Sequence, residues 1–259
     1  MMRLLVLLTA LAMPLVGWLS NNGTFGPDNG TISDQYPTLL VAAGYAFAIW
    51  GLIFVLDIVY AGWQMTGSRK TDPTLTRVAP WAAAGFALTT AWMPLFAMSQ
   101  FWLCLLVIFA ATACLIRSAM ILSHDRTPQE GQWMWAWLPL SMHAGWLSLA
   151  AFLNLAQVIV AYRLASTTDM LAWSLVLFGL AAVMLLVVNM RMRGNIDYVI
   201  AALWALIAVY VKQSHSGLPG AQTAAWVALG IGAVLIIQTV MLRRRYPGGL
   251  LPNPARAPA

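Results

Sequence analysis

Residues 170–190 have the sequence MLAWSLVLFGLAAVMLLVVNM and contain no charged side chain. An apolar run of about 18 or more residues indicates a transmembrane helix, since about 20 helical residues cross the hydrocarbon core of a bilayer. The run is too long and too continuously apolar for a strand of a transmembrane barrel, in which lipid-facing and lumen-facing residues alternate. This stretch therefore predicts a membrane-spanning helix.

Similar runs fill most of the chain. They lie at about 4–20, 38–63, 79–98, 101–122, 133–162, 170–190, 196–212 and 222–242. Charged residues make up only 8% of the chain, against about 25% in soluble domains, so the chain lacks the polar surface that water requires. We predict an all-α membrane protein of about eight transmembrane helices, the first of them retained rather than removed as a signal peptide.

The basic residues lie almost entirely in the short segments between the apolar runs. If the N-terminus is on the inner side, the inner segments hold all of the Lys and Arg residues except Arg163 and Lys212. This asymmetry is the one that the positive-inside rule predicts for a chain with both ends inside. We therefore expect an integral protein of a bacterial cytoplasmic membrane. We expect no nucleic-acid partner, because the charges do not gather on one face.

Two kinds of side chain inside the predicted helices are candidates for function. Asp57 and His143 are ionisable, and such groups in a membrane pair with one another, face a cavity or lose their charge. Trp50, Trp92 and Trp146 lie deep in three different helices, where flat rings around a shared cavity suit a flat apolar ligand. Structural hydrogen bonding for the first pair, and ordinary packing for the tryptophans, are the alternative interpretations.

Three segments carry a family resemblance: GYAFAIWG at 44–51, ALTTAWMPLF at 87–96 and GWLSLAAFLN at 145–154. In order and spacing they resemble the second-, third- and fifth-helix motifs of the tryptophan-rich sensory protein family, also called the translocator protein family. The resemblance implies a five-helix bundle over residues 1–165. It also implies a pocket beneath the outer loop at 21–37, where family members bind porphyrins and other flat hydrophobic molecules.

The motifs also suggest which residues line such a pocket. By motif position the lining would include Trp50, Trp92, Phe96, Trp146, Ala150 and Leu153. Ala150, one turn after Trp146, would leave room for a ring. The remaining candidate ligand-binding residues are Tyr45, Asp57, Thr89, His143 and Asn154.

The rest of the chain lies outside this resemblance. Residues 166–245 are predicted to add three transmembrane helices, and the Pro-rich segment 246–259 is predicted to be a disordered cytoplasmic tail. We expect a membrane sensor or regulator that binds a flat hydrophobic molecule such as a porphyrin and requires no cofactor. Its partners would be the lipid bilayer and that ligand. Whether two copies of the chain form a homodimer is left undecided by the sequence.

Two other functions follow from the same residues. A transporter of a small lipophilic or amphipathic solute would use Asp57 and His143 to couple proton movement. An enzyme that degrades porphyrin in light would use the tryptophans, as has been suggested for the family. The sequence contains no recognisable acid–base pair for catalysis and no Cys/His cluster with zinc spacing, so we do not expect an enzyme or a metal site.

Overall fold

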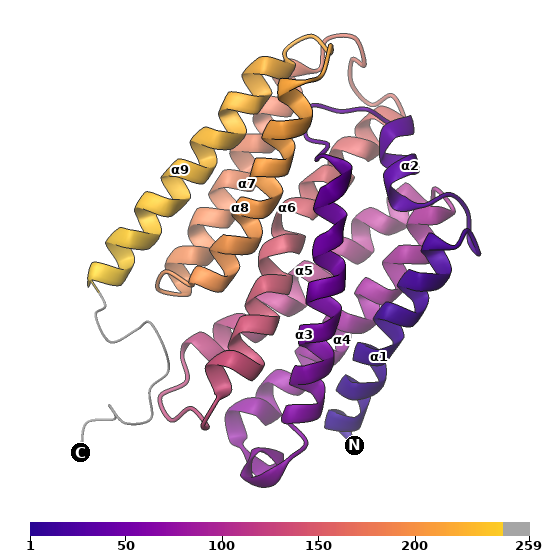
Figure 1. Ribbon diagram of the computed structural model, residues 1–259. Coiled ribbons are helices and arrows are strands. Elements are labelled where there is room, and N and C mark those ends of the chain that lie inside the picture. The colour runs from indigo at the N-terminus through magenta and orange to yellow at the C-terminus, as the bar shows by residue number, and fades with distance from the viewer. Residues whose placement is uncertain (246–259) are drawn as a thin grey trace.

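A computed structural model of the protein describes residues 1–245, and these residues form helices joined by short turns, with no β-strand among them (Figure 1). The α-helices are α1 (Met2–Asn21), α2 (Asn29–Gln35), α3 (Ile49–Trp63), α4 (Pro73–Ala97), α5 (Phe101–Ser123), α6 (Leu138–Ala161), α7 (Leu171–Arg191), α8 (Ile196–Ser214) and α9 (Ala221–Arg245). Short 3₁₀ helices cover Gly44–Ala48 and Gly67–Thr71, and a π-helical turn, Trp133–Trp137, leads into α6. The predicted tail at 246–259 lies outside the described residues.

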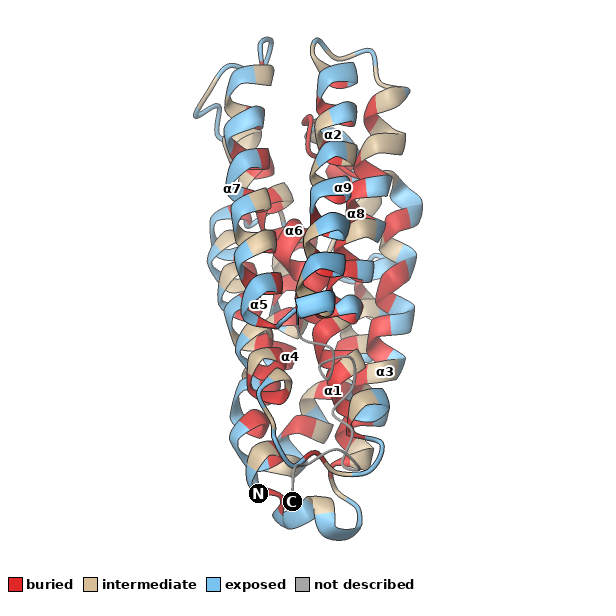
Figure 2. Ribbon diagram, turned by 90° about the vertical axis from the view of Figure 1, so that its left-hand side faces the viewer, coloured by how far each residue is buried: buried red, intermediate tan, exposed pale blue. Residues whose placement is uncertain are grey.

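The predicted all-α membrane fold is confirmed. Within the described part of the chain, seven helices are long and apolar enough to cross a membrane. The remaining predicted stretch, 79–98, lies mainly in α4, which is 25 residues long but begins with the less apolar sequence PTLTR. Outward-facing side chains such as Leu106, Val176 and Val183 are exposed and apolar, as expected of surfaces that face lipid (Figure 2). The predicted orientation, with both ends inside, stays a prediction.

Helix α6 lies between two groups of helices. On one side α1, α4 and α5 pack in succession and α5 packs on α6, while on the other side α8 packs on α6 and α9 packs on α7 and α8 (Figure 1). The close approach of α8 depends on Gly145, because a Cβ atom there would collide with the carbonyl oxygen of Tyr198. The buried apolar residues of both groups form a single connected core.

The second predicted span, at 38–63, begins later than expected. Residues 38–43 are not helical, and the 3₁₀ helix starts at Gly44. Their backbone is satisfied from α8: the Gln213 side-chain amide donates to the carbonyl oxygens of Thr38 and Val41 at 3.1 and 3.0 Å. The amide of Ala43 donates to the carbonyl oxygen of Ala208 at 2.9 Å. Irregular backbone at this depth is tolerated because protein groups replace the missing helical bonds.

The outer loop contains a short helix that its turn-forming composition did not reveal. The Asp28 carboxylate caps α2, accepting hydrogen bonds from the amides of Gly30 and Thr31 at 2.9 and 3.1 Å and from the Thr31 hydroxyl at 2.6 Å. The Thr31 hydroxyl bond holds the pKa of Asp28 below its ordinary value of 3.8. Ile32 and Ser33 of α2 are buried, so α2 covers the upper end of the bundle.

Candidate ligand-binding site

Three tryptophans from different helices meet in the interior. Trp50 of α3 lies against Trp92 of α4, with ring centroids 6.3 Å apart and planes inclined by 30°, and meets Trp146 of α6 edge to face at 5.9 Å. Trp92 in turn stacks on Phe96, with centroids 4.7 Å apart. All three indoles are buried rather than facing lipid. The result is a continuous aromatic cluster between α3, α4 and α6.

An inner cavity lies against this cluster, beneath α2. Its free space is about 30 Å³, which corresponds to one or two water molecules. Predicted residues that line it are Trp50, Trp92, Phe96, Trp146, Ala150, Leu153 and Asn154. The rest of its lining is Ser33, Val41, Ala42, Phe47, Ile108 and Gln157. As it stands the cavity does not hold a ring system, so a flat ligand must move some of these side chains.

An outer cleft adjoins the inner cavity. It lies between α1 and α3, below α2, and has a volume of about 500 Å³, within the range of about 300–1,000 Å³ that is typical of small-molecule sites. Phe47 and Trp50 line both spaces. These two rings therefore form the wall between an open cleft and a closed aromatic interior.

Polar contacts hold parts of the cluster in place and leave others free. The Trp92 indole N–H donates to Asn154 Oδ1 at 2.9 Å, and the Asn154 amide donates to the carbonyl oxygen of Ala150 at 2.9 Å. By contrast, the buried indole N–H groups of Trp50 and Trp146 have no acceptor among the described residues. Buried donors of this kind are costly unless an acceptor reaches them, so a ligand with a carbonyl or carboxylate group would gain hydrogen bonds here.

A model of the TSPO-like protein family matches residues 3–241. The chain belongs to this family. No curated protein and no solved structure matches it. The match extends well past residue 165, where the predicted five-helix bundle ends, and takes in α7, α8 and most of α9.

The ionisable pair of this TSPO-like protein lies directly beside the aromatic cluster. His143 Nδ1 is 2.7 Å from Asp57 Oδ2, and both side chains are fully buried. His143 Nε2 is 3.4 Å from Thr89 Oγ1, whose own proton is donated to the carbonyl oxygen of Gly85 at 2.9 Å. The Thr89 hydroxyl oxygen is therefore left to act as an acceptor toward His143. Asp57 and His143 thus form a buried pair of ionisable side chains.

The Asp57–His143 pair is separated from the inner cavity by one ring. Phe86 stacks on the His143 ring with centroids 5.9 Å apart, and Trp50 meets it edge to face at 5.7 Å. Asp57, Thr89 and His143 do not line the cavity, and of the three only His143 is shown to contact the lining residue Trp50. Among the described residues no group of three His, Cys, Asp or Glu side chains is arranged to hold a metal ion.

The remaining candidate, Tyr45, lies elsewhere in the TSPO-like fold. Its ring is 45% exposed and packs edge to face against Trp204 of α8, with centroids 5.4 Å apart. Conversely, Phe47 was not predicted, although its position three residues before Trp50 would put both rings on one helical face. Ser33, which Gln157 approaches at 3.4 Å, could not be predicted, because it belongs to α2, the short helix that the composition of the outer loop did not reveal.

Proposed function

We propose that this TSPO-like protein is a membrane sensor or regulator that binds a flat hydrophobic molecule, such as a porphyrin, at the aromatic cluster. The single observation that carries the proposal is the position of Trp50, which borders both the 500 Å³ outer cleft and the closed inner cavity. A ligand that enters the cleft meets this ring first. Movement of Trp50 and Phe47 then joins the two spaces into one site large enough for a ring system.

The chemistry of the walls selects the ligand class. Aromatic rings stack favourably on other flat π-systems, each such pair contributing about 0.5–1.5 kcal/mol beyond the burial of area. The free N–H groups of Trp50 and Trp146 add two donors for acceptor atoms at the edge of a ligand. A flat apolar molecule with carboxylate or carbonyl groups at its rim, as in a porphyrin, fits both requirements.

A titration of the purified protein with protoporphyrin, followed by tryptophan fluorescence, tests this site. The double variant Trp92→Ala/Trp146→Ala should bind at least tenfold more weakly, because it removes two walls of the cavity. Trp226→Ala provides the control, since Trp226 is on α9 and 60% exposed. Unchanged affinity in the double variant, or an equal loss in the control, would rule out the aromatic cluster as the site.

A second candidate function is transport of a small lipophilic solute coupled to protons. The observation that favours it is the buried Asp57–His143 pair, which lies one ring away from the cavity, because paired ionisable groups at membrane depth are typical of proton relays. Proteoliposomes loaded with protoporphyrin would release it faster under an imposed pH gradient, and Asp57→Asn would abolish the acceleration. No release with or without a gradient would exclude transport of this solute and leave the binding proposal standing.

A further inference from the structure

Four arginines from separate elements line a cleft at the end of α5. They are Arg77 of α4, Arg117 of α5, Arg126 of the α5–α6 loop and Arg191 at the end of α7. The cleft is open at the surface of the protein and has a volume of about 500 Å³. It is distinct from the aromatic site, because none of its lining residues lines the inner cavity or the outer cleft.

The positive charge of this arginine cleft is balanced only in part, by a single carboxylate among the residues that line it. Within residues 1–245 none of the four guanidinium groups has a hydrogen-bond or ion-pair partner. The cleft contains one carboxylate, Asp125, and its oxygens are occupied: Oδ1 accepts from the Thr127 amide at 3.1 Å and Oδ2 from the Gln132 amide at 2.7 Å. Four guanidinium groups around one cleft with one carboxylate give it an excess of positive charge, which favours an anion there.

The surfaces leading to the cleft are apolar and face outward. On α7, Val183 and Val187 lie two turns and one turn before Arg191 on the same face, and both are exposed. On α5, Leu106 lies three turns from Arg117 on the same face and is 68% exposed. Met120 and Ile121 form part of the cleft wall. An elongated molecule with one end in the cleft would therefore meet cations at that end and apolar helix faces along its length.

We propose that the arginine cleft binds the phosphate headgroup of an anionic glycerophospholipid whose acyl chains lie along the exposed faces of α5 and α7. Guanidinium groups match phosphate oxygens with paired hydrogen bonds, and basic pockets between transmembrane helices favour anionic headgroups. A free phosphate ion would satisfy the arginines but not the apolar faces, so the lipid is the better fit. This inference is independent of the proposed function.

Native mass spectrometry of the detergent-solubilised protein, titrated with dioleoylphosphatidylglycerol, tests the proposal. Dioleoylphosphatidylcholine supplies the same chains without net charge, and inorganic phosphate supplies the anion without chains. We expect the anionic lipid to bind at one site, phosphatidylcholine to bind more weakly, and phosphate alone to compete only at high concentration.

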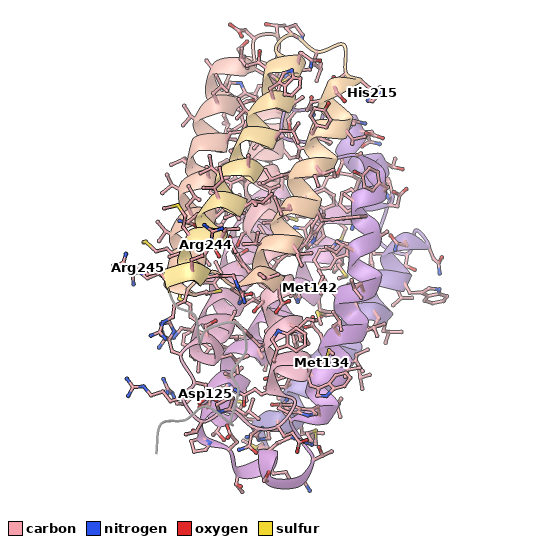
Figure 3. The ribbon with its side chains drawn as sticks, turned by 60° about the vertical axis from the view of Figure 1, so that its left-hand side comes forward. Asp125, Met134, Met142, His215, Arg244 and Arg245 are labelled. Atoms are coloured by element: carbon pink, nitrogen blue, oxygen red, sulfur yellow. The ribbon has the colours of Figure 1, made fainter. Side chains whose placement is uncertain are left out.

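The variant Arg117→Gln/Arg191→Gln should weaken binding of the anionic lipid about 30-fold, from roughly 1 kcal/mol for each basic residue. Arg244→Gln/Arg245→Gln is the matched control: it removes the same charge from the end of α9, where both side chains are exposed and lie apart from the region of Asp125 (Figure 3). If the Arg117→Gln/Arg191→Gln variant does not fold, a second double variant replaces it. Arg77→Gln/Arg126→Gln should show the same loss of affinity for the anionic lipid.

Three results would overturn the assignment. Equal losses in the cleft and control variants would mean that only the general charge of the surface attracts lipid. Equal affinity for the anionic and the zwitterionic lipid would remove the role of the arginines. Binding of inorganic phosphate with no preference for phosphatidylglycerol would assign the cleft to a free anion instead.

Discussion

Trp50 and His143 lie edge to face, with ring centroids 5.7 Å apart and planes at 89°. Because Trp50 also borders the outer cleft and the inner cavity, a ligand that displaces this indole changes the surroundings of the Asp57–His143 pair. The aromatic cluster and the Asp57–His143 pair are thus in direct physical contact. Binding and the protonation of this pair are expected to influence each other.

Trp50 should be the most sensitive single position for ligand binding. Trp50→Ala removes both the stacking surface and the wall between the two spaces, so we expect protoporphyrin affinity to fall at least tenfold. Trp50→Phe keeps a ring but loses the N–H, and its loss should be smaller. Fluorescence titration measures both. If Trp50→Ala bound as tightly as the unchanged protein, the ligand would not pass through this wall.

The Asp57–His143 pair should be more sensitive to loss of one partner than of both. Leaving a buried charge without its partner costs about 3–5 kcal/mol, whereas apolar replacement of a whole pair is often much milder. His143→Leu should therefore lower the unfolding temperature more than Asp57→Leu/His143→Leu, as measured by thermal unfolding in detergent. A double variant that is less stable than His143→Leu would mean that the pair is not a coupled unit.

Loss of the Asp28 cap should release α2 from the upper end of the bundle. Asp28→Ala should destabilise this helix by about 1 kcal/mol, while Asp28→Asn, another good N-cap, should be tolerated. Hydrogen–deuterium exchange of residues 29–35 measures the effect. Equal exchange in all three proteins would show that burial of Ile32, rather than the cap, holds α2.

The same cap predicts a response to acid. Since the pKa of Asp28 is lowered in the folded protein, its stabilisation of α2 is fully present above the ordinary value of 3.8 and is lost as the pH falls through the lower folded value. A nitroxide on Gln35→Cys, with Cys104 and Cys114 replaced by alanine, should become more mobile only below about pH 4. The Asp28→Asn protein should show no such transition, and an identical one would contradict the assignment.

Gly145 should tolerate no side chain. Gly145→Ala places a methyl group against the carbonyl oxygen of Tyr198 and forces α6 and α8 apart, at a cost of about 1–3 kcal/mol for overpacking. Gly179→Ala is the control, because no atom lies within 4 Å of a Cβ atom there. Thermal unfolding in detergent should separate the two variants, and similar melting temperatures would mean that the helices adjust freely at this crossing.

Several features could not be predicted because they depend on contacts between distant segments. Residues 38–43 are apolar and resemble the start of a helix, but Gln213 of α8 supplies hydrogen bonds that stabilise an irregular path. Tyr45 lies within a recognised motif, yet the turn of the 3₁₀ helix directs it to Trp204. Neither outcome is encoded in local periodicity, since both require α8 to be in place.

That the chain is a bundle of membrane helices follows from its amino-acid order alone, because a long, continuously apolar run satisfies its backbone in lipid by forming a helix. The sequence also indicated which side chains were candidates, through tryptophans and ionisable groups at membrane depth. Which of these side chains meet became clear from the packed helices alone. That outcome depends on the rotation and crossing of neighbouring helices, which close packing at positions such as Gly145 determines and no single helix specifies alone.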